Sequence, residues 1–75
     1  MYFYLITDKN DEVTLVHNKV FVKDEIEDFI KQAKEDFKNI YPNRKITIHD
    51  VEDFLVDNEN FWKWDYEFTV DVNKI

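Results

Sequence analysis

The chain contains one stretch with a strict period of two, Trp62-Lys63-Trp64-Asp65-Tyr66-Glu67-Phe68-Thr69-Val70-Asp71-Val72. Every even-numbered residue in it is apolar, and every odd-numbered residue is polar. This period is typical of a β-strand with one buried face and one face in water. We therefore predict a strand over residues 62–72, with its apolar side chains in the core and its acids on the wet face.

Two further strands are predicted near the N-terminus. Residues 2–7 are apolar on both faces, which indicates an interior strand covered on both sides. Residues 8–11 form a turn, in which Asn10 and Asp11 tolerate left-handed backbone angles. Residues 12–17 then form a hairpin with the first strand.

A long amphipathic helix is predicted over residues 24–41. Asp24 and Glu27 fit a variant capping box at its start, and Pro42 ends it because the residue before a proline disfavours helical angles. Apolar residues recur at spacings of three and four and form one stripe. The stripe consists of Ile26, Phe29, Ile30, Ala33, Phe37 and Ile40.

Residues 45–61 fit two interpretations. Residues 45–48 could form a short strand. Thr47 could instead cap a helix with Asp50 at its third position, and acids in a first helical turn suit the helix dipole. We favour the short helix, over residues 48–58.

The predicted order is β-β-α-(short α)-β, in a single domain over residues 1–75. We expect an α+β fold, a two-layer sandwich with a three-stranded, mainly antiparallel sheet packed on one long helix. The last strand would anchor the core through Trp64, Tyr66 and Phe68, which would face the helix if that strand lay beside the first. The other face of the first strand then needs a cover, either the short helix or a second copy of the protein.

The composition excludes several classes of function. The chain has 75 residues and lacks Cys, Gly and Ser, so thiolate metal sites, glycine-rich phosphate loops and the usual nucleophiles are missing. We expect no enzymatic activity and no cofactor. No apolar run approaches the ~20 residues of a membrane span, and no signal peptide is recognisable, so we expect a cytoplasmic protein, in the host cell if phage-encoded.

No metal site is predicted. Asp8, Asn10 and Glu12 occupy positions 1, 3 and 5 of a calcium loop, but Val13 stands where Gly is needed and Lys19 where a bidentate Glu is needed. An ordinary turn is the better interpretation. The two histidines, at positions 17 and 49, have no zinc-ligand spacing, and we expect both at polar surface or edge positions.

Acidic residues are concentrated in the second half of the chain. The net charge is −7, and residues 50–75 contribute −6 of it. This imbalance disfavours direct binding to nucleic acid or to anionic membranes, because both require a basic face. The predicted partner-binding residues are Asp50, Glu52, Asp53, Asp57, Glu59, Asp65, Glu67, Asp71 and, as a possible aromatic hot spot, Trp62.

The leading hypothesis is a small acidic binding protein that mimics nucleic acid and inhibits a basic, nucleic-acid-handling protein. In size and charge the chain is similar to small phage inhibitors of host defence, including anti-restriction and anti-CRISPR proteins. This similarity is one of composition, without a shared motif. The alternatives are a self-associating structural or regulatory module, such as a homodimer, and a solvated acidic face that only keeps an aromatic-rich protein in solution. A third alternative is a metal-binding accessory protein, which calorimetry with Ca²⁺ or Zn²⁺ would test.

Overall fold

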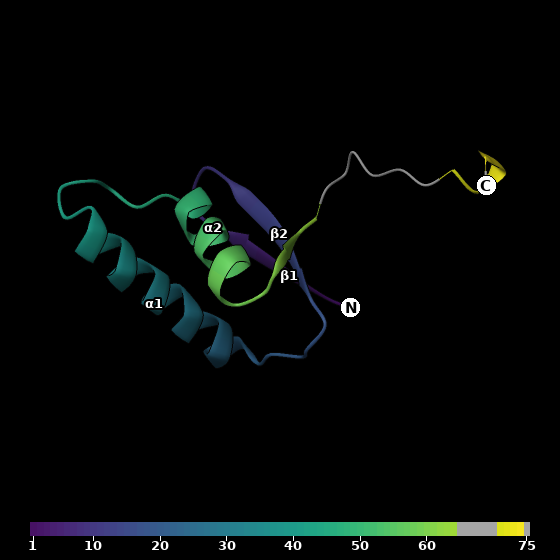
Figure 1. Ribbon diagram of the computed structural model, residues 1–75, viewed down its shortest axis with the longest axis horizontal. Coiled ribbons are helices and arrows are strands. Elements are labelled where there is room, and N and C mark those ends of the chain that lie inside the picture. Colours follow the sequence, from purple (N-terminus) through teal and green to yellow (C-terminus); the bar gives the residue numbers. More distant parts are fainter. Residues whose placement is uncertain (65–70, 75) are drawn as a thin grey trace.

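The computed structural model describes residues 1–64 and 71–74. Its elements are β1 (Tyr2–Thr7), β2 (Glu12–His17), α1 (Lys23–Ile40), α2 (Ile48–Asn58), β3 (Trp62–Lys63) and a short 3-10 turn, η1 (Val72–Lys74). The strands form one antiparallel sheet in the order β1-β2-β3, and both helices lie on one side of it (Figure 1). The predicted α+β fold is confirmed.

The sheet is centred on β2. β1 pairs with it along its whole length, from Tyr2 opposite His17 to Thr7 opposite Glu12. β3 pairs with the other side of β2, where Trp62 lies opposite Val16. The prediction that residues 2–7 form an interior strand was therefore wrong, and β3 does not lie beside β1. The apolar residues on the second face of β1 are exposed instead of covered.

Among the residues that the structure describes, the last strand covers fewer positions than predicted. β3 comprises Trp62 and Lys63, and the backbone N–H of Trp64 still donates to the carbonyl of Thr14 at 3.0 Å. Val72 belongs to η1, so the predicted strand end at residue 72 was wrong. Residues 65–70, with Tyr66 and Phe68, lie outside the described residues.

The short helix α2 begins and ends where the sequence predicts. Thr47 is its N-cap, and the Asp50 carboxylate accepts the backbone N–H of Thr47 at 2.8 Å while the backbone N–H of Asp50 is directed at the Thr47 hydroxyl at 3.4 Å. This reciprocal arrangement is a capping box, and it favours the helical over the extended interpretation of this segment.

The long helix α1 begins one residue earlier than predicted. The N-cap position is Val22, whose side chain cannot accept a hydrogen bond. The Glu25 carboxylate accepts the backbone N–H of Val22 at 3.1 Å, so Glu25 takes the role predicted for Glu27. The predicted pairing of Asp24 with Glu27 was wrong because the chain becomes helical before Asp24.

The core lies between the sheet and the helices, and α2 contributes most of the helical side of it. α2 packs against β2 and β3, and α1 packs against α2. In α1 only Ala33 is fully buried. The core cluster consists of Val13, Leu15, Ala33, Ile48, Val51, Leu55 and Phe61. Its packing fixes which face of the sheet is left open to water.

An aromatic cluster closes one end of the core. The buried ring of Phe61 lies 5.6 Å from the ring of Tyr4, 5.7 Å from that of Phe21 and 6.3 Å from that of Phe29. The Tyr4 hydroxyl accepts the backbone N–H of Phe21 at 2.7 Å and donates to the carbonyl of Lys19 at 2.9 Å. These bonds hold the connection between β2 and α1 against the sheet.

Candidate functional site

The face of the sheet turned away from the helices carries an apolar surface, which we call the outer sheet face. It is defined by two rows of residues across the three strands. One row is Phe3, Val16 and Trp62, and the other is Leu5, Thr14 and Trp64. Neither row contains a charged residue. Thr7 and Glu12 lie beyond the second row, where the β1–β2 turn begins, so one acid borders this surface.

Several large side chains of the outer sheet face are exposed to water. The exposed fractions are 57% for Phe3, 62% for Leu5, 47% for Trp62 and 43% for Trp64. The rings of Phe3 and Trp64 contact each other edge to face, with centroids 5.1 Å apart. Val16 is buried beneath this layer yet does not belong to the core cluster, because it lies on the opposite side of the sheet from the helices.

The orientation of β3 is the reverse of the prediction. Trp62 and Trp64 were expected to face the core, but both lie on the outer sheet face. Lys63, expected on the wet face, points toward α2 instead. Its Nζ lies 3.3 Å from the Glu52 carboxylate and 3.4 Å from that of Asp53. Phe61, two residues earlier, takes the buried position on the same side as Lys63.

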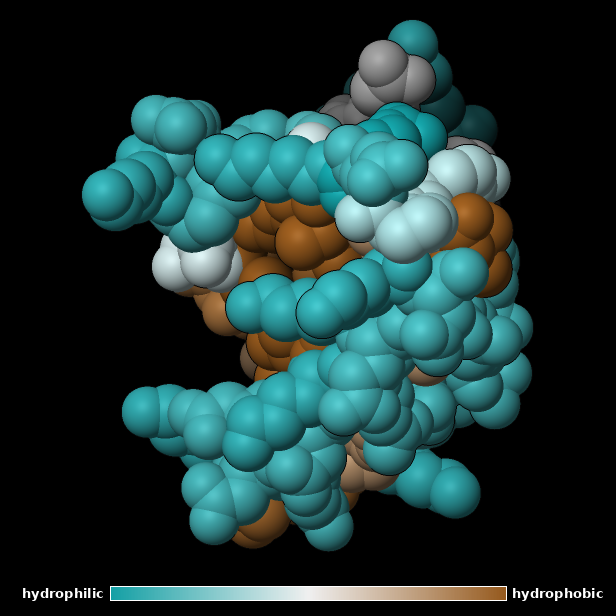
Figure 2. All heavy atoms as spheres, turned by 90° about the vertical axis from the view of Figure 1, so that its left-hand side faces the viewer, coloured by the Kyte–Doolittle hydropathy of each residue, from teal (hydrophilic) through white to brown (hydrophobic). Residues whose placement is uncertain are grey.

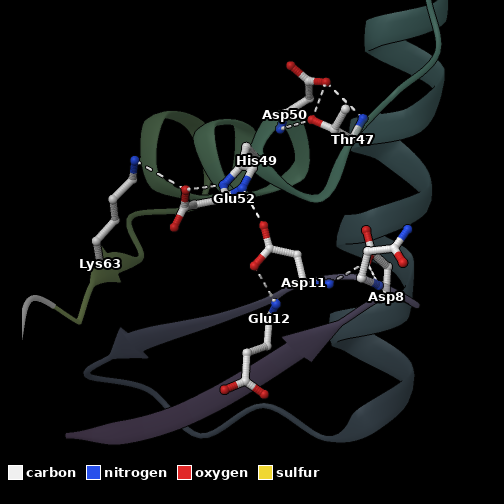
Figure 3. A network of polar contacts seen from close by, with 9 residues as sticks. Asp8, Asp11, Glu12, Thr47, His49, Asp50, Glu52 and Lys63 are labelled. Atoms are coloured by element: carbon white, nitrogen blue, oxygen red, sulfur yellow. Dashed lines mark hydrogen bonds and ion pairs between the residues drawn. The ribbon is translucent and has the colours of Figure 1, made fainter.

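A network of polar contacts joins β3, α2 and the β1–β2 turn (Figure 3). Lys63 and His49 both approach the Glu52 carboxylate, with the His49 Nδ1 at 3.5 Å. The His49 Nε2 lies 2.6 Å from the Asp11 carboxylate. Both ring nitrogens of His49 therefore face carboxylates, which only accept hydrogen bonds when ionised, so the protonated ring fits this position best.

The network shifts the titration of its members. The hydrogen bond to Asp11, followed by that to Glu52, raises the pKa of His49 above its ordinary 6.5. The backbone N–H of Glu12, followed by His49, lowers the pKa of Asp11 below its ordinary 3.8. The hydrogen bond to Glu52 raises the pKa of Lys63 above 10.5, so this lysine stays charged throughout the physiological range.

On α2, three of the predicted partner-binding acids have partners within the chain, namely Asp50, Glu52 and Asp53. Asp50 caps α2, and its hydrogen bonds from the backbone and then the side chain of Thr47 lower its pKa below 3.8. Glu52 and Asp53 flank Lys63, and the Glu52 side chain is only 13% exposed. Residues 50–59 and β3 do lie side by side, but the contact between them is made by a lysine that offsets two of the acids.

The other predicted partner-binding acids differ in their exposure to water. Asp57 is exposed on α2. Glu59 is half-buried, and Asp71 is exposed and accepts the backbone N–H of Asn73 at 2.9 Å. Asp65 and Glu67 lie outside the described residues. The continuous acidic surface expected from residues 50–71 therefore reduces, in the described residues, to separate carboxylates on α2 and at residue 71.

The prediction of a surface or edge position holds for His49 but was wrong for His17. His17 is 7% exposed and lies among aromatic rings, with the centroids of Phe21 and Phe61 each 4.8 Å away. Its Nδ1 accepts the backbone N–H of Lys19 at 2.9 Å, and its Nε2 donates to the carbonyl of Glu59 at 3.0 Å. Both ring nitrogens are thus satisfied inside the protein, which is how a polar ring can be buried.

The β1–β2 turn uses its acids for its own backbone. The Asp8 carboxylate accepts the backbone N–H groups of Asn10 and Asp11 at 2.8 and 2.9 Å. This is the arrangement of an Asx turn, in agreement with the ordinary turn predicted here, although neither Asn10 nor Asp11 takes a positive φ. Among residues 1–64 and 71–74, no group of three or more His, Asp or Glu side chains is arranged to hold a metal ion.

Sequence reasoning included Trp62 among the candidate residues but missed Phe3 and Leu5. The signal was present, because residues 2–7 are apolar at both odd and even positions. We interpreted this pattern as a strand covered on both faces, whereas one of its faces is exposed.

In the described part of the chain, no helix is long and apolar enough to cross a membrane. Comparison of the chain with protein-family models, curated proteins and solved structures finds no match.

Proposed function

We propose that this chain is a small acidic binding protein that inhibits a basic, nucleic-acid-handling protein by covering its charged surface. The observation that carries the proposal is the outer sheet face, an uncharged surface with exposed aromatic side chains on a chain of net charge −7. Aromatic residues of this kind commonly form the centre of protein interfaces, and a surrounding excess of charge selects the partner.

The size of the outer sheet face suits the centre of an interface. Four large apolar side chains that are each about half exposed amount to roughly 400 Å² of accessible area. The largest apolar patch on a monomer is about 300–600 Å² and is often functional. A stable interface buries about 800 Å² on each partner, so a partner would also cover the polar surroundings of this patch.

The negative charge of the whole chain favours a basic partner. Glu12 borders the outer sheet face. The exposed Asp53 and Asp57 lie one turn apart on α2, on the other side of the sheet, and Lys63 offsets part of the charge of Asp53. The Cβ atoms of residues at this spacing are about 5–6 Å apart, which corresponds to roughly half the charge density along one DNA strand. Attraction between such a surface and a basic groove would give fast association that salt weakens.

A pull-down followed by charge reversal tests the proposal. The protein is immobilised, a partner is captured from the host at low salt, and binding is measured against a competing DNA duplex. We expect Asp53→Lys with Asp57→Lys to lose most of the binding at low salt. The matched control is Glu35→Lys with Asp36→Lys, which changes the net charge equally on α1 and should retain binding. Undiminished binding by the α2 variant, or failure of DNA to compete, would contradict the proposal.

The contact at the aromatic residues is tested separately. Replacing Trp62 by Ala removes an exposed ring without opening the core, so the fold should be retained. Truncation of a hot-spot residue typically costs about 2 kcal/mol or more of binding, a loss of about thirtyfold in affinity. Exposed Tyr41, at the far end of α1, serves as the control through Tyr41→Ala, which should leave partner affinity unchanged.

A second candidate function, self-association, is favoured by the edge strand β1. Its sequence, YFYLIT, contains neither a charge nor a proline to discourage pairing with another strand. Sedimentation at low and high salt separates this candidate from the first. A dimer that is insensitive to salt and is broken by Leu5→Lys supports self-association, whereas a monomer at every concentration excludes it.

A further inference from the structure

A hollow lies where the β1–β2 turn, the middle of α1 and the loop between the two helices meet. Its volume is about 370 Å³. Figure 2 shows apolar atoms at the bottom of a hollow on the side of the molecule that carries this loop, with long hydrophilic side chains projecting around it. This volume falls within the ~300–1,000 Å³ of pockets that hold small molecules.

Five branched apolar residues form the apolar part of the lining. Ile6 comes from β1, Ile30 from α1, and the remaining branched residues from the start of α2 and the loop before it. These are Ile46, Ile48 and Val51. Ile48 and Val51 belong to the core cluster, and Ile6, Ile30 and Ile46 pack against it, so this lining is an open continuation of the core.

The charged residues of the lining are mainly cations. Lys9, Lys34 and Lys45 all line the hollow, although the whole chain has only ten Lys and Arg residues against seventeen acids. Among the described residues, the ion pairs involve Lys23, Lys63 and His49 and none of these three lysines. The single acid in the lining, Asp8, already accepts two backbone N–H groups of its own turn.

We propose that this hollow binds a small amphipathic anion, an apolar body with one carboxylate head. The apolar body would rest on the isoleucine lining, and the head would lie among the three lysines. Local charge in the lining is opposite in sign to that of the whole molecule, so the hollow selects anions that the rest of the surface repels. The site is separate from the outer sheet face, because Ile6 points to the helical side of the sheet and Phe3 and Leu5 to the other.

The test uses three probes of equal chain length, octanoate, octan-1-ol and octylammonium, with inorganic phosphate as a fourth. Each is titrated into the isotopically labelled protein, and amide shifts are followed by NMR. We expect octanoate to shift the amides of Ile46, Ile48 and Lys34 in a saturable manner, more tightly than the other three probes do. Equal binding of octan-1-ol would show that the hollow binds apolar molecules without selecting for negative charge. Equal binding of phosphate would reveal an anion site only, and absence of saturable shifts would show that no site exists; each of these outcomes overturns the proposal.

Variants of the lysines complete the test. Lys34→Gln with Lys45→Gln should weaken octanoate binding roughly three- to tenfold, the range for two exposed charge contacts. Lys31→Gln with Lys38→Gln makes the same change of charge on α1 outside the hollow, and it should leave octanoate affinity unchanged. All four side chains are exposed, so the variants should fold. Equal weakening in both double variants would mean that total charge, and not this hollow, controls the binding.

Discussion

His49 contacts two carboxylates, one of which is distant from it in the sequence. Its ring lies between Asp11, thirty-eight positions away, and Glu52 on the next turn of α2. A lone histidine among acids predicts a titration near neutral pH, and the contacts with both carboxylates add the direction of the shift. Because the side chains are more than half exposed for His49 and nearly so for Asp11, solvent screens much of this interaction.

The His49–Asp11 contact predicts a stability that falls as the solution becomes alkaline. The pKa of His49 is raised by folding, so its contribution is complete below its ordinary value of 6.5 and is lost as the pH rises through the folded-state value. The pKa of Asp11 is lowered, so its contribution is present above 3.8 and is lost as the pH falls through the lowered value. Urea unfolding between about pH 6 and pH 9 should therefore show a declining midpoint.

The control for this pH dependence is His49→Gln. Its midpoint should vary less with pH over the same range, and the difference between the two proteins isolates His49 because His17 is present in both. Identical pH profiles would contradict the assignment of the effect to this contact.

At the scale of elements, α2 depends on its capping box. Thr47 and Asp50 satisfy each other's backbone N–H groups at the start of a helix that carries much of the core. Residues within three positions of each other determine this arrangement, which is why the sequence predicted where α2 begins. The hydrogen bonds of Asp50 are thus explained by the fold, and its contact with a partner stays a prediction.

The capping box predicts the effect of Thr47→Ala. Loss of an N-cap side chain costs about 0.5–2 kcal/mol of stability, and the cost should appear in the free energy of unfolding from urea titration. Thr47→Ser keeps the hydroxyl and should lie close to the unsubstituted protein. A negligible cost for Thr47→Ala would show that the helix start is fixed by packing of Ile48 and Val51 alone.

At the scale of the whole molecule, the two faces of the sheet have opposite roles. The inner face is joined to α2 through Leu55, which is completely buried, whereas the outer sheet face presents Leu5 at 62% exposure. A domain of 75 residues has a small free energy of unfolding. The stability lost with one core side chain is therefore a large fraction of that free energy.

A matched pair of leucine substitutions measures this difference. Leu55→Ala should lower the free energy of unfolding by about 2–5 kcal/mol, so that a large share of the molecules is unfolded at room temperature. Leu5→Ala removes the same atoms from an exposed position and should change the free energy of unfolding by about 0.5 kcal/mol or less. Circular dichroism with urea titration measures both. A cost for Leu5→Ala near that of Leu55→Ala would mean that the outer sheet face is covered in solution.

The sequence by itself determined the α+β class, the β1–β2 hairpin, the bounds of α2 and the excess of negative charge. These follow from periodicity, turn chemistry and capping, in which neighbouring residues decide the outcome. Only the tertiary structure decided which face of each strand is covered. A period of two separates the faces of β3 without saying which one meets the helices. Phe61 is buried on the helical side of the sheet, so Lys63, two residues later, points to the same side and meets Glu52 and Asp53 on α2. Trp64 was thereby placed against Phe3, and Trp62 on the same surface, for which we propose a partner.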